Sequence, residues 1–348
     1  MERIPLTPPA PGEMLVRVTA CTLCGSDLHT LQGHRTTPTP TILGHEIIGE
    51  IAALGPDFEY RDLNGIQLAL GDRITWALAA SCGTCFYCRA GIPQKCHSLF
   101  KYGHEPMTRS PQLSGGLAQY CHLAKGSHVL RLTQTLPDEV ACPANCATAT
   151  VAAALRTAGG CERKDIFVQG AGLLGLTACA MAKSAGARTI LISDPDEERL
   201  NLATSFGATH SHNPNEAHGN DVLIAFANHF ANEGRGFDLI LEMSGACAVM
   251  EQGLELLRIG GHYIWVGAVF PGPPVPVSPE RITKRLLTIS GIHNYTPQDL
   301  VTAVAFLEAN HSRYPFHDLV RKWFALDDFK SAVDFALQER PVRVGIRP

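Results

Sequence analysis

The sequence lacks several features that would place it in a specialised class. No apolar run approaches the ~18 residues that a membrane-spanning helix needs, and the N-terminal stretch MERIPLTPPAPGEM contains no apolar signal region. Charge of one sign never accumulates, since the 348 residues carry a formal net charge of -4 and only 18% of them are charged. Nothing therefore indicates binding to nucleic acid or to a membrane, and we expect a cytoplasmic protein.

The chain does have ample material for a core and for two domains. Hydrophobic residues make up 45% of it. Residues 13–150 contain short β-like runs separated by glycine and proline, such as EMLVRVTA and GDRITWAL, which predicts a β-rich domain. From residue 151 strands alternate with helices, beginning with DIFVQGAGLLGLTACAMAKSAGARTILISD, and this alternation predicts a doubly wound parallel sheet.

Beyond residue 295 we expect a helix at PQDLVTAVAFLEAN and a closing strand at RPVRVGIRP. The segment HSHNPNEAHGND carries His210, His212 and His218, but its polar composition, with glycine, asparagine and proline, favours a surface loop over a metal site.

Four of the twelve cysteines lie close together, in the stretch SCGTCFYCRAGIPQKC. Cys82, Cys85, Cys88 and Cys96 supply four thiolates from one loop, enough for a closed tetrahedral zinc site. The alternatives are two disulfides, which a reducing compartment disfavours, and an iron–sulfur cluster, for which the flanking motifs of a ferredoxin are missing. Because a four-thiolate site has no open position, we expect this zinc to stabilise the loop and to perform no chemistry.

A glycine motif, G-x-G-x-x-G, follows a predicted strand and begins a predicted helix, the context in which it binds a dinucleotide. Gly170 permits the tight turn, Gly172 lets the backbone approach the pyrophosphate, and Gly175 allows close packing of the helix on the strand. The amides at the helix N-terminus, including those of Leu173 and Leu174, are expected to face the phosphates. The alternative is a glycine-rich turn without a ligand.

The end of the following strand indicates which dinucleotide is bound. Asp194 closes RTILISD at the spacing expected for a carboxylate that binds the ribose hydroxyls. Its charge would repel the 2′-phosphate of NADP, so we predict NAD. Arg199 lies nearby in the sequence, and its positive charge makes the predicted preference for NAD over NADP weaker.

Two further stretches, CTLCGSDLH and LGHEIIGE, contain possible metal ligands, although a lone Cys24 or His45 is more often a packed core residue. With the four-cysteine loop and the glycine motif, in this order, they resemble the zinc-dependent medium-chain alcohol dehydrogenases, the group that includes sorbitol and threonine dehydrogenases. The resemblance covers nearly the whole chain. It implies an α/β protein with a GroES-like catalytic domain at residues 1–150 and 296–348 and a Rossmann NAD-binding domain at residues 151–295.

The resemblance also implies a catalytic zinc bound by Cys24, His45 and Cys146. Three protein ligands leave an open position for water or a substrate alcohol, whose pKa the metal lowers. Glu46 is the carboxylate that enters the coordination shell in some relatives. Cys142 competes with Cys146 for the third ligand position, and we favour Cys146 from its place in the pattern.

The resemblance assigns roles to residues around this zinc. Asp27 is expected to orient His45. Ser26 and His29 match a proton relay that runs through the ribose hydroxyl to solvent, although they could instead be a turn residue and a surface histidine. Arg343 matches a contact to the cofactor's phosphate bridge, with a solvated arginine as the alternative. The remaining cysteines are expected to be buried apolar residues: Cys21, Cys121, Cys142, Cys161, Cys179 and Cys247.

Within this family, KYGHE, LSGGLAQYCHL and PANCATATVAAAL resemble most closely a group described as phosphonate-catabolism-associated alcohol dehydrogenases. This implies oxidation of a small hydroxyalkylphosphonate, such as 2-hydroxyethylphosphonate. A phosphonate dianion needs charge-assisted hydrogen bonds, and Arg35, Lys101, His104 and Arg109 are the candidates to donate them, each with a solvated surface charge as its alternative. The other possible functions are a polyol or amino-alcohol dehydrogenase and a non-catalytic NAD-binding zinc protein.

The resemblance implies two zinc ions per chain and NAD as cofactors, a small-molecule alcohol as substrate, and a homodimer or homotetramer. Relatives begin with a longer β-hairpin before PGEMLVRV, so we expect either a trimmed domain or a misassigned start codon, with no proposed site residue affected.

Overall fold

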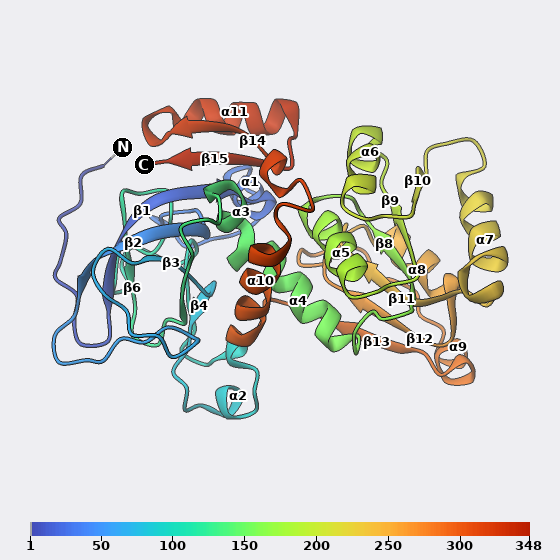
Figure 1. Cartoon of the computed structure of the whole chain (residues 1–348), viewed down its shortest axis with the longest axis horizontal. Helices are drawn as coiled ribbons and strands as arrows, with labels where there is room; N and C mark the ends of the chain where they lie inside the picture. Colours follow the sequence, from blue (N-terminus) through green and yellow to red (C-terminus); the bar gives the residue numbers. More distant parts are fainter. Residues whose placement is uncertain (1) are drawn as a thin grey trace. The chain divides into compact units, whose positions relative to one another are not determined.

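The computed structural model describes residues 2–348, which divide into two compact units. Unit 1 contains the chain up to Ala149 together with Asn294–Pro348, and unit 2 is Thr150–His293 (Figure 1). The first boundary falls within helix α4 (Ala147–Thr157). None of the helices between residues 2 and 348 combines the length and the apolar character that crossing a bilayer demands.

Unit 1 is built on a seven-stranded sheet with the order β14-β15-β1-β2-β3-β7, in which β6 also pairs with β1. Its central strand is β1 (Met14–Leu23), which pairs antiparallel with β2 (Glu46–Leu54), β6 (Tyr120–Leu123) and β15 (Arg343–Arg347). The closing strand predicted at the C-terminus is therefore confirmed, and it carries the end of the chain back to the strand that precedes Cys24.

The other elements of unit 1 are shorter. They are α1 (Gly25–Leu31), β3 (Arg73–Trp76), β4 (Ala79–Ala80), α2 (Phe86–Arg89), η1 (Pro93–Lys95), β5 (Phe100–Lys101), β7 (Val129–Arg131), α3 (Asp138–Ala141), η2 (Cys142–Asn145), α10 (Pro297–Asn310), η4 (Phe316–Leu319), β14 (Val320–Ala325), η5 (Leu326–Asp328) and α11 (Phe329–Glu339). The helix predicted at PQDLVTAVAFLEAN is confirmed as α10, with a capping box between Thr296 and Asp299 at its start.

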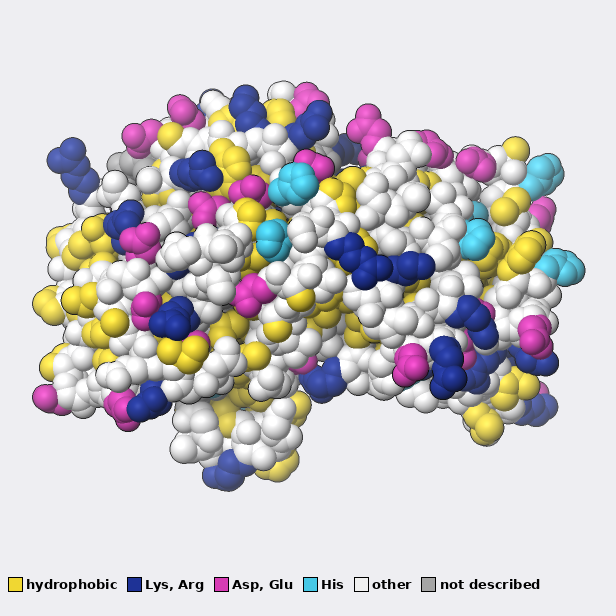
Figure 2. Space-filling view, in the orientation of Figure 1, with side chains coloured by type: hydrophobic (Ala, Val, Ile, Leu, Met, Phe, Trp, Pro, Cys, Tyr) yellow, Lys and Arg dark blue, Asp and Glu magenta, His cyan; other side chains and the backbone are white. Residues whose placement is uncertain are grey.

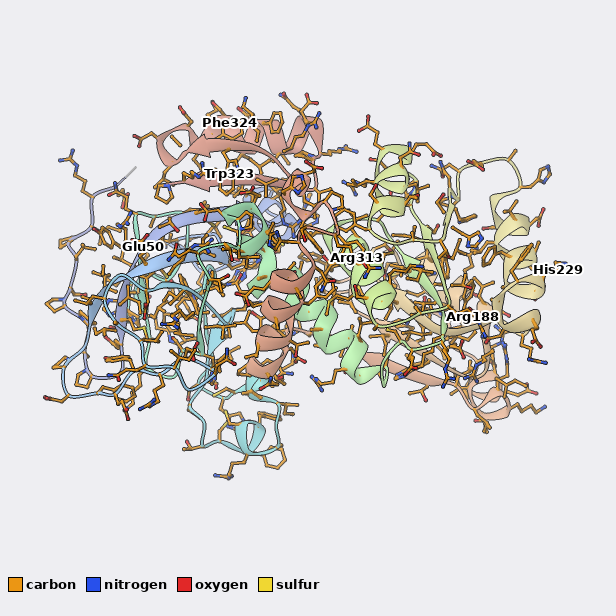
Figure 3. The ribbon with its side chains drawn as sticks, viewed as in Figure 1. Glu50, Arg188, His229, Arg313, Trp323 and Phe324 are labelled. Carbon is orange, nitrogen blue, oxygen red and sulfur yellow. The ribbon has the colours of Figure 1, made fainter. Side chains whose placement is uncertain are left out.

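Large apolar side chains fill the core of unit 1 and fix the sheet. Val16, Ile47, Trp76 and Leu123 are fully buried in one cluster. Burying each such side chain stabilises the fold by about 1.5–3 kcal/mol relative to leaving it in water. At the sheet's other end, consecutive residues of β14 point to opposite faces, as in any strand, and Phe324 contacts Phe335 of α11 with ring centroids 5.7 Å apart (Figure 3).

Unit 2 is a six-stranded sheet with the order β10-β9-β8-β11-β12-β13, and every pairing in it is parallel. Its elements are β8 (Asp165–Gln169), α5 (Leu173–Ser184), β9 (Thr189–Ser193), α6 (Glu197–Ser205), β10 (His210–His212), α7 (Gly219–His229), η3 (Ala231–Glu233), β11 (Phe237–Glu242), α8 (Cys247–Leu256), β12 (Leu257–Trp265), α9 (Pro279–Arg285) and β13 (Thr288–Gly291). The strand order reverses beside β8, which is where such sheets bind ligands. The predicted combination of a parallel doubly wound sheet and a β-rich unit is confirmed.

Two side-chain pairs hold the amino ends of these strands. Arg188 donates to both carboxylate oxygens of Asp165, at 2.8 and 2.6 Å (Figure 3 labels Arg188), and Arg258 donates to Asp238 at 2.6 Å. These pairs lie at the end of the sheet away from the glycine motif, so their role is structural.

The prediction of a surface loop at HSHNPNEAHGND is wrong in part. Its first three residues form β10, paired parallel with β9, and His212 is buried. The His212 ring lies 2.9 Å from the Ser193 hydroxyl and 2.8 Å from the Gly219 carbonyl oxygen. A strand of three residues is too short for its alternation to show in the sequence, and all three residues are polar.

Candidate metal and nucleotide sites

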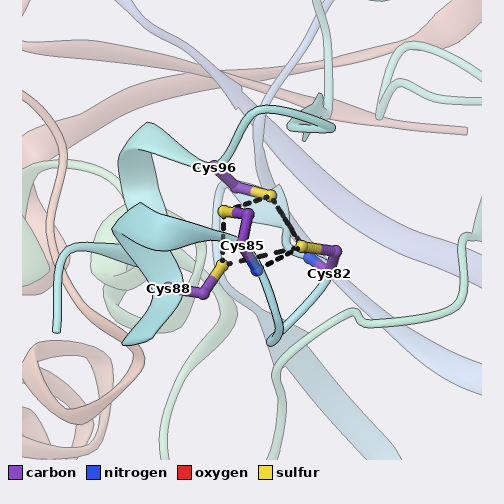
Figure 4. A group of neighbouring side chains, drawn as sticks. All are labelled: Cys82, Cys85, Cys88 and Cys96. Atoms are coloured by element: carbon purple, nitrogen blue, oxygen red, sulfur yellow. Dashed lines mark hydrogen bonds between the residues drawn. The ribbon is translucent and has the colours of Figure 1, made fainter. Parts of the chain in front are cut away.

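The four-cysteine loop brings its thiols into a compact cluster (Figure 4). The Sγ atom of Cys82 lies 3.5 Å from that of Cys96 and 3.9 Å from that of Cys88, and the Sγ atom of Cys85 lies 3.5 Å from that of Cys88 and 3.9 Å from that of Cys96. A tetrahedron of sulfurs, each about 2.3 Å from a central zinc, has edges of about 3.8 Å. The spacing therefore fits zinc, and it does not fit disulfides, in which the sulfurs lie about 2.05 Å apart.

Local backbone geometry places these sulfurs. Gly83 and Gly91 adopt positive φ values of 72° and 79°, which turn the chain between ligands. The amide and hydroxyl of Thr84 and the amide of Cys85 donate hydrogen bonds to the sulfur of Cys82, and they lower the pKa of that thiol to about 5. These donors thus favour the thiolate form of Cys82, the form that a metal binds. The segment around α2 stands out from unit 1 as a lobe of its own (Figures 1 and 2).

A second cluster joins residues that are far apart in the sequence. One ligand atom from each of Cys24, His45, Glu46 and Cys146 lies within 4.8 Å of the others. Cys142, the alternative to Cys146, is fully buried outside this group. Of the other cysteines predicted to be apolar core residues, Cys247 is half-buried and the rest are buried.

Asp27 holds two of these segments together. Its fully buried carboxylate accepts hydrogen bonds from the amide of Cys24 at 3.0 Å and from the amide of Gly44 at 3.3 Å, and it lies 3.2 Å from Nδ1 of His45. Because a carboxylate only accepts, Nδ1 carries the proton, and Nε2 is left with a lone pair for a metal. Burial lowers the pKa of His45, but Asp27 and Cys24 outweigh this effect and raise it to about 10, so a metal that binds Nε2 has to displace a proton from it.

Asn145, which the sequence gave no reason to select, positions the third segment. Its fully buried amide nitrogen donates to the carbonyl oxygens of His45, at 3.0 Å, and of Trp76, at 2.9 Å. Tyr295 donates its hydroxyl to the carbonyl of Asn145 and accepts the amide of Leu78 at 2.9 Å. The residue directly before Cys146 is therefore fixed to the backbone of the ligand His45.

Glu46 is paired within unit 1 by two donors. Arg343 forms a bidentate ion pair with it, both N···O distances being 2.8 Å, and the hydroxyl of Thr22 donates to it at 2.6 Å. The alternative prediction, that Arg343 is a solvated arginine, is wrong, since its side chain is only 10% exposed. Its guanidinium also lies 3.7 Å from the sulfur of Cys24. A hydrogen bond from Cys146, together with Arg343 and His45, holds the pKa of Cys24 well below its usual value.

Helix α1 carries the predicted relay residues. Cys24 is its N-cap, and Ser26 and His29 follow three residues apart, so they share one face of the helix. Ser26 is half-buried and His29 is exposed. The candidate metal ligand and the candidate relay residues thus belong to one short helix.

Half-buried cations lie beside this second cluster. Burial and the nearby charge of Arg35 lower the pKa of Lys101 to about 8, while the thiols of Cys146 and Cys24 act in the opposite direction. Neither Arg35 nor Lys101 has a carboxylate partner within residues 2–348. Burying uncompensated like charges is costly, so this pair is suited to an anion from outside the chain.

His104 lies against His45, with ring centroids 5.3 Å apart. Its Nδ1 atom is buried and has no hydrogen-bond partner in the described chain. Burial and the charges of His45, Lys101 and Arg35 hold the pKa of His104 far below its usual range, so the ring is neutral.

The sequence expectation for Arg109 is wrong. Its guanidinium donates to Glu105 and to the carbonyl of Leu99, both at 2.8 Å, and it lies over the ring of Phe100. Glu105 also accepts the backbone amide of Lys101 at 2.7 Å, but within residues 2–348 it pairs neither with the Lys101 ammonium nor with the Arg35 guanidinium.

The glycine motif of unit 2 has three different environments. Gly170 has φ +102°, and a Cβ there would lie 3.1 Å from Ser244. A Cβ on Gly175 would lie 1.8 Å from the carbonyl oxygen of Gly170. A Cβ on Gly172, the N-cap of α5, would meet no atom within 4 Å. The positive φ of Gly170, the tight packing at Gly175 and the open space at Gly172 thus match the three roles of the glycines in a dinucleotide-binding turn. The amides of Leu173 and Leu174 begin the helix beside the open space at Gly172.

Asp194 follows β9 and connects it with this turn. Its carboxylate accepts the amide of Ala171 at 2.6 Å and that of Asp196 at 3.0 Å. Each oxygen keeps a second lone pair, so the carboxylate can still accept ribose hydroxyls. Arg199 lies 3.6 Å from the carboxylate of Asp196, which compensates its charge.

Comparison with known proteins agrees with both units. A family model described as the alcohol dehydrogenase GroES-like domain matches residues 10–134, and one described as zinc-binding dehydrogenase matches residues 174–309. The 5-exo-hydroxycamphor dehydrogenase of Pseudomonas putida is 30% identical over 335 residues, covering 95% of this chain and 90% of that protein. The L-threonine 3-dehydrogenase of Pyrococcus furiosus is 32% identical over 291 residues, covering 82% and 76% respectively.

Solved structures show the same arrangement of elements. An alcohol dehydrogenase of Thermotoga maritima has a TM-score of 0.89 at 29% identity, covering 100% of this chain and 93% of its own. A zinc-binding dehydrogenase of Sinorhizobium meliloti 1021, solved with NADP, scores 0.86 at 26% identity, covering 99% and 94%. Galactitol-1-phosphate dehydrogenase of Escherichia coli scores 0.84 at 26% identity, covering 100% and 96%.

Proposed function

Since the chain belongs to the zinc-dependent medium-chain alcohol dehydrogenase family, we propose that it oxidises a small phosphonate-bearing alcohol, such as 2-hydroxyethylphosphonate, with NAD as hydride acceptor. Zinc, a nicotinamide cofactor and alcohol-dehydrogenase-type chemistry come with the family. The substrate class and the choice of NAD are the proposal.

Cys24, His45 and Cys146 are the residues that would bind the catalytic zinc, whose Lewis acidity lowers the pKa of the substrate alcohol. Asp27 fixes the tautomer and orientation of His45. Arg343 and Thr22 hold the carboxylate of Glu46, and this competes with its use as a fourth ligand. Ser26 and His29, both on α1, would carry the alcohol proton away. A bound nicotinamide would supply the hydride acceptor that the conversion of the alcohol to a carbonyl compound requires.

The observation that carries the substrate class is the pair Arg35 and Lys101. The charged groups of both side chains lack a carboxylate partner in the described chain. Lys101 is near enough to Cys146 and Cys24 for their charges to affect its pKa. A phosphonate dianion would pair with both cations by accepting charge-assisted hydrogen bonds from them. The neutral ring of His104, with its unpartnered Nδ1, supplies a further hydrogen-bonding group.

A polyol phosphate is the second candidate, because one structural neighbour is named for galactitol 1-phosphate. A neutral polyol or an amino alcohol of the threonine type is less suited, because neither offers a dianion to the two cations. The measurement of kcat/KM for matched alcohols with phosphonate, phosphate and no anionic group separates these candidates.

The decisive variant is Arg35→Ala. It should lower kcat/KM for the phosphonate alcohol about 10- to 100-fold, the loss expected for a hydrogen bond between charged groups, and leave a neutral alcohol nearly unaffected. Arg109→Ala is the matched control, since that arginine is already engaged by Glu105. Equal losses on both alcohols in Arg35→Ala would contradict the anion-binding role.

The preference for NAD rests on Asp194, whose negative charge would meet the 2′-phosphate of NADP. Asp194→Ala should therefore weaken use of NAD+ and improve relative use of NADP+, measured as the ratio of kcat/KM for the two cofactors. A wild-type protein that prefers NADP+ would contradict this assignment.

We also propose a homo-oligomer that uses the β13 edge of unit 2. Within the described chain β13 pairs with β12 alone, and the neighbouring Leu286 is 70% exposed. An open strand edge with apolar flanks favours pairing with a second copy. Light scattering should give a dimer or tetramer, and Leu286→Asp should shift it toward monomer.

A further inference from the structure

The end of helix α1 is a Schellman motif. Gly33 has φ +78°, its amide donates to the carbonyl of Thr30 at 3.1 Å, and the amide of His34 donates to the carbonyl of His29 at 2.9 Å. These are the two reversed hydrogen bonds that define this helix ending. The motif folds the chain back so that the residue after the glycine meets the residue five positions earlier.

In most Schellman motifs those two residues are apolar and form a hydrophobic contact. Here both are histidines. The Nδ1 atoms of His29 and His34 lie 3.5 Å apart, at the outer limit of a hydrogen bond, and their ring centroids are 5.7 Å apart at an angle of 49°. Both side chains are exposed. A contact that normally fastens a helix end therefore joins two imidazole rings, each of which can accept a proton at one ring nitrogen and donate one from the other.

We propose that His34 is the outer member of the proton relay and receives the substrate proton from His29. This inference rests on the proposed function, in which His29 takes the proton that the alcohol loses. The proton arrives at Nε2 of His29, and the proton on its Nδ1 passes to Nδ1 of His34. His34 then loses its own Nε2 proton to water or buffer.

The step balances. One proton enters the pair and one leaves it, no electrons move, and neither ring keeps a charge. The exposed rings recover their starting tautomers by exchange with bulk water before the next turnover. His34 acts through His29 and need not touch substrate or cofactor, so its contribution is to accept a proton at Nδ1 and release one at Nε2.

The test compares His34→Phe with the wild type. Phenylalanine keeps a ring against His29 and so preserves the helix ending, but it cannot carry a proton. Single-turnover proton release is followed with a pH indicator in weak buffer, together with NADH absorbance. We expect proton release to slow about fivefold in His34→Phe, less than general base catalysis can supply, because water can still reach His29.

Added imidazole distinguishes proton transfer from a structural role. It should restore proton release in His34→Phe and leave the wild type unchanged. His317→Phe is the matched control, since His317 is an exposed histidine elsewhere in unit 1. Adding His34→Phe to a His29→Gln variant should cause no further loss, because the inner member is already missing.

The outcomes separate this inference from the proposed substrate. Any alcohol that is oxidised releases its proton, so a neutral alcohol can be used and the test does not depend on phosphonate. His34→Phe with wild-type proton release at every buffer concentration, or a loss that imidazole does not restore, would overturn the role of His34 alone. A protein that forms no NADH from any alcohol would overturn both proposals.

Discussion

The two cysteine-containing clusters of unit 1 differ in how the chain builds them. The cluster of Cys82, Cys85, Cys88 and Cys96 comes from one loop, has a single ligand type and stands in an exposed lobe. The cluster around Cys24 comes from three separate segments, mixes thiols with an imidazole and lies among buried partners.

On our proposal, the difference distinguishes a zinc site that stabilises the fold from one that takes part in the reaction. Four thiolates at tetrahedral spacing saturate a zinc ion. In the second cluster Arg343 and Thr22 engage the fourth candidate, Glu46, so that under our proposal three ligands would hold the metal and one position would be available to substrate. Surrounding groups such as Asp27 and Asn145 are needed there because no local loop fixes the ligands.

The largest expected effect separates the two clusters directly. Cys24→Ser should lower kcat/KM about 1,000-fold or more, since metal-assisted catalysis contributes several kcal/mol and each ~1.4 kcal/mol is a factor of ten. Bound zinc, measured by elemental analysis, should fall from two ions to one per chain while NAD binding persists. Cys142→Ala is the matched control and should keep both ions. Unchanged turnover in Cys24→Ser would refute the assignment of the reactive site.

Asp27→Asn tests whether the second cluster depends on its supporting residue. An asparagine keeps the size but can present an amide to Nδ1 of His45, which favours the wrong tautomer. We expect a loss of about 10- to 100-fold in zinc affinity of this site or in kcat, with the four-cysteine site still filled. Equal loss of zinc from both sites would show that the effect is global unfolding.

The pH dependence of substrate binding tests the cations beside the second cluster. Because the pKa of Lys101 is lowered to about 8, its ammonium is present below pH 8 and is lost as pH rises through that value. The KM for a phosphonate alcohol should rise up to about tenfold between pH 7 and 9.5, whereas that for a neutral alcohol should not follow this titration. Lys101→Met should remove the dependence. A parallel rise for the neutral alcohol would exclude Lys101 as its cause.

The smallest effect on turnover is expected in the four-cysteine loop. Cys85→Ser should release that zinc and lower the Tm by about 5 °C, as loss of a few kcal/mol does in a chain of this size. The kcat/KM of the folded protein should stay within about twofold of the wild type, because a closed site offers no position to substrate. Loss of activity in a protein that is still folded would contradict the assignment of the four-cysteine site as purely structural.

The same contrast explains what the sequence could predict. Ligands that lie close together in the chain, such as Cys82 and Cys85, are visible from their spacing alone. The glycine motif is equally local, and its flanking strand and helix confirm its setting. The parallel sheet of unit 2 was predictable because its strands are apolar runs bounded by helices, with the three-residue β10 as the exception.

Contacts between residues that only the tertiary structure brings together could not be predicted from the sequence. Glu46 and Arg343 meet only because β15 pairs with β1, and Asn145 reaches His45 across the core. Arg109 looked equivalent to Arg35, yet Glu105 compensates one and not the other. The pair of His29 and His34 does have a local signal in the sequence, because a glycine directly before the second histidine marks a helix end. The role predicted for His29 does not depend on that glycine.

The most direct test of the central claim is the kcat/KM of the zinc-loaded wild type with NAD+ for 2-hydroxyethylphosphonate and for 1-propanol. The account predicts a preference of about 100-fold or more for the phosphonate, since two cations would each gain a charge-assisted hydrogen bond. Comparable or better turnover of 1-propanol or of neutral polyols would contradict it and would leave Arg35 and Lys101 without a role in substrate selection.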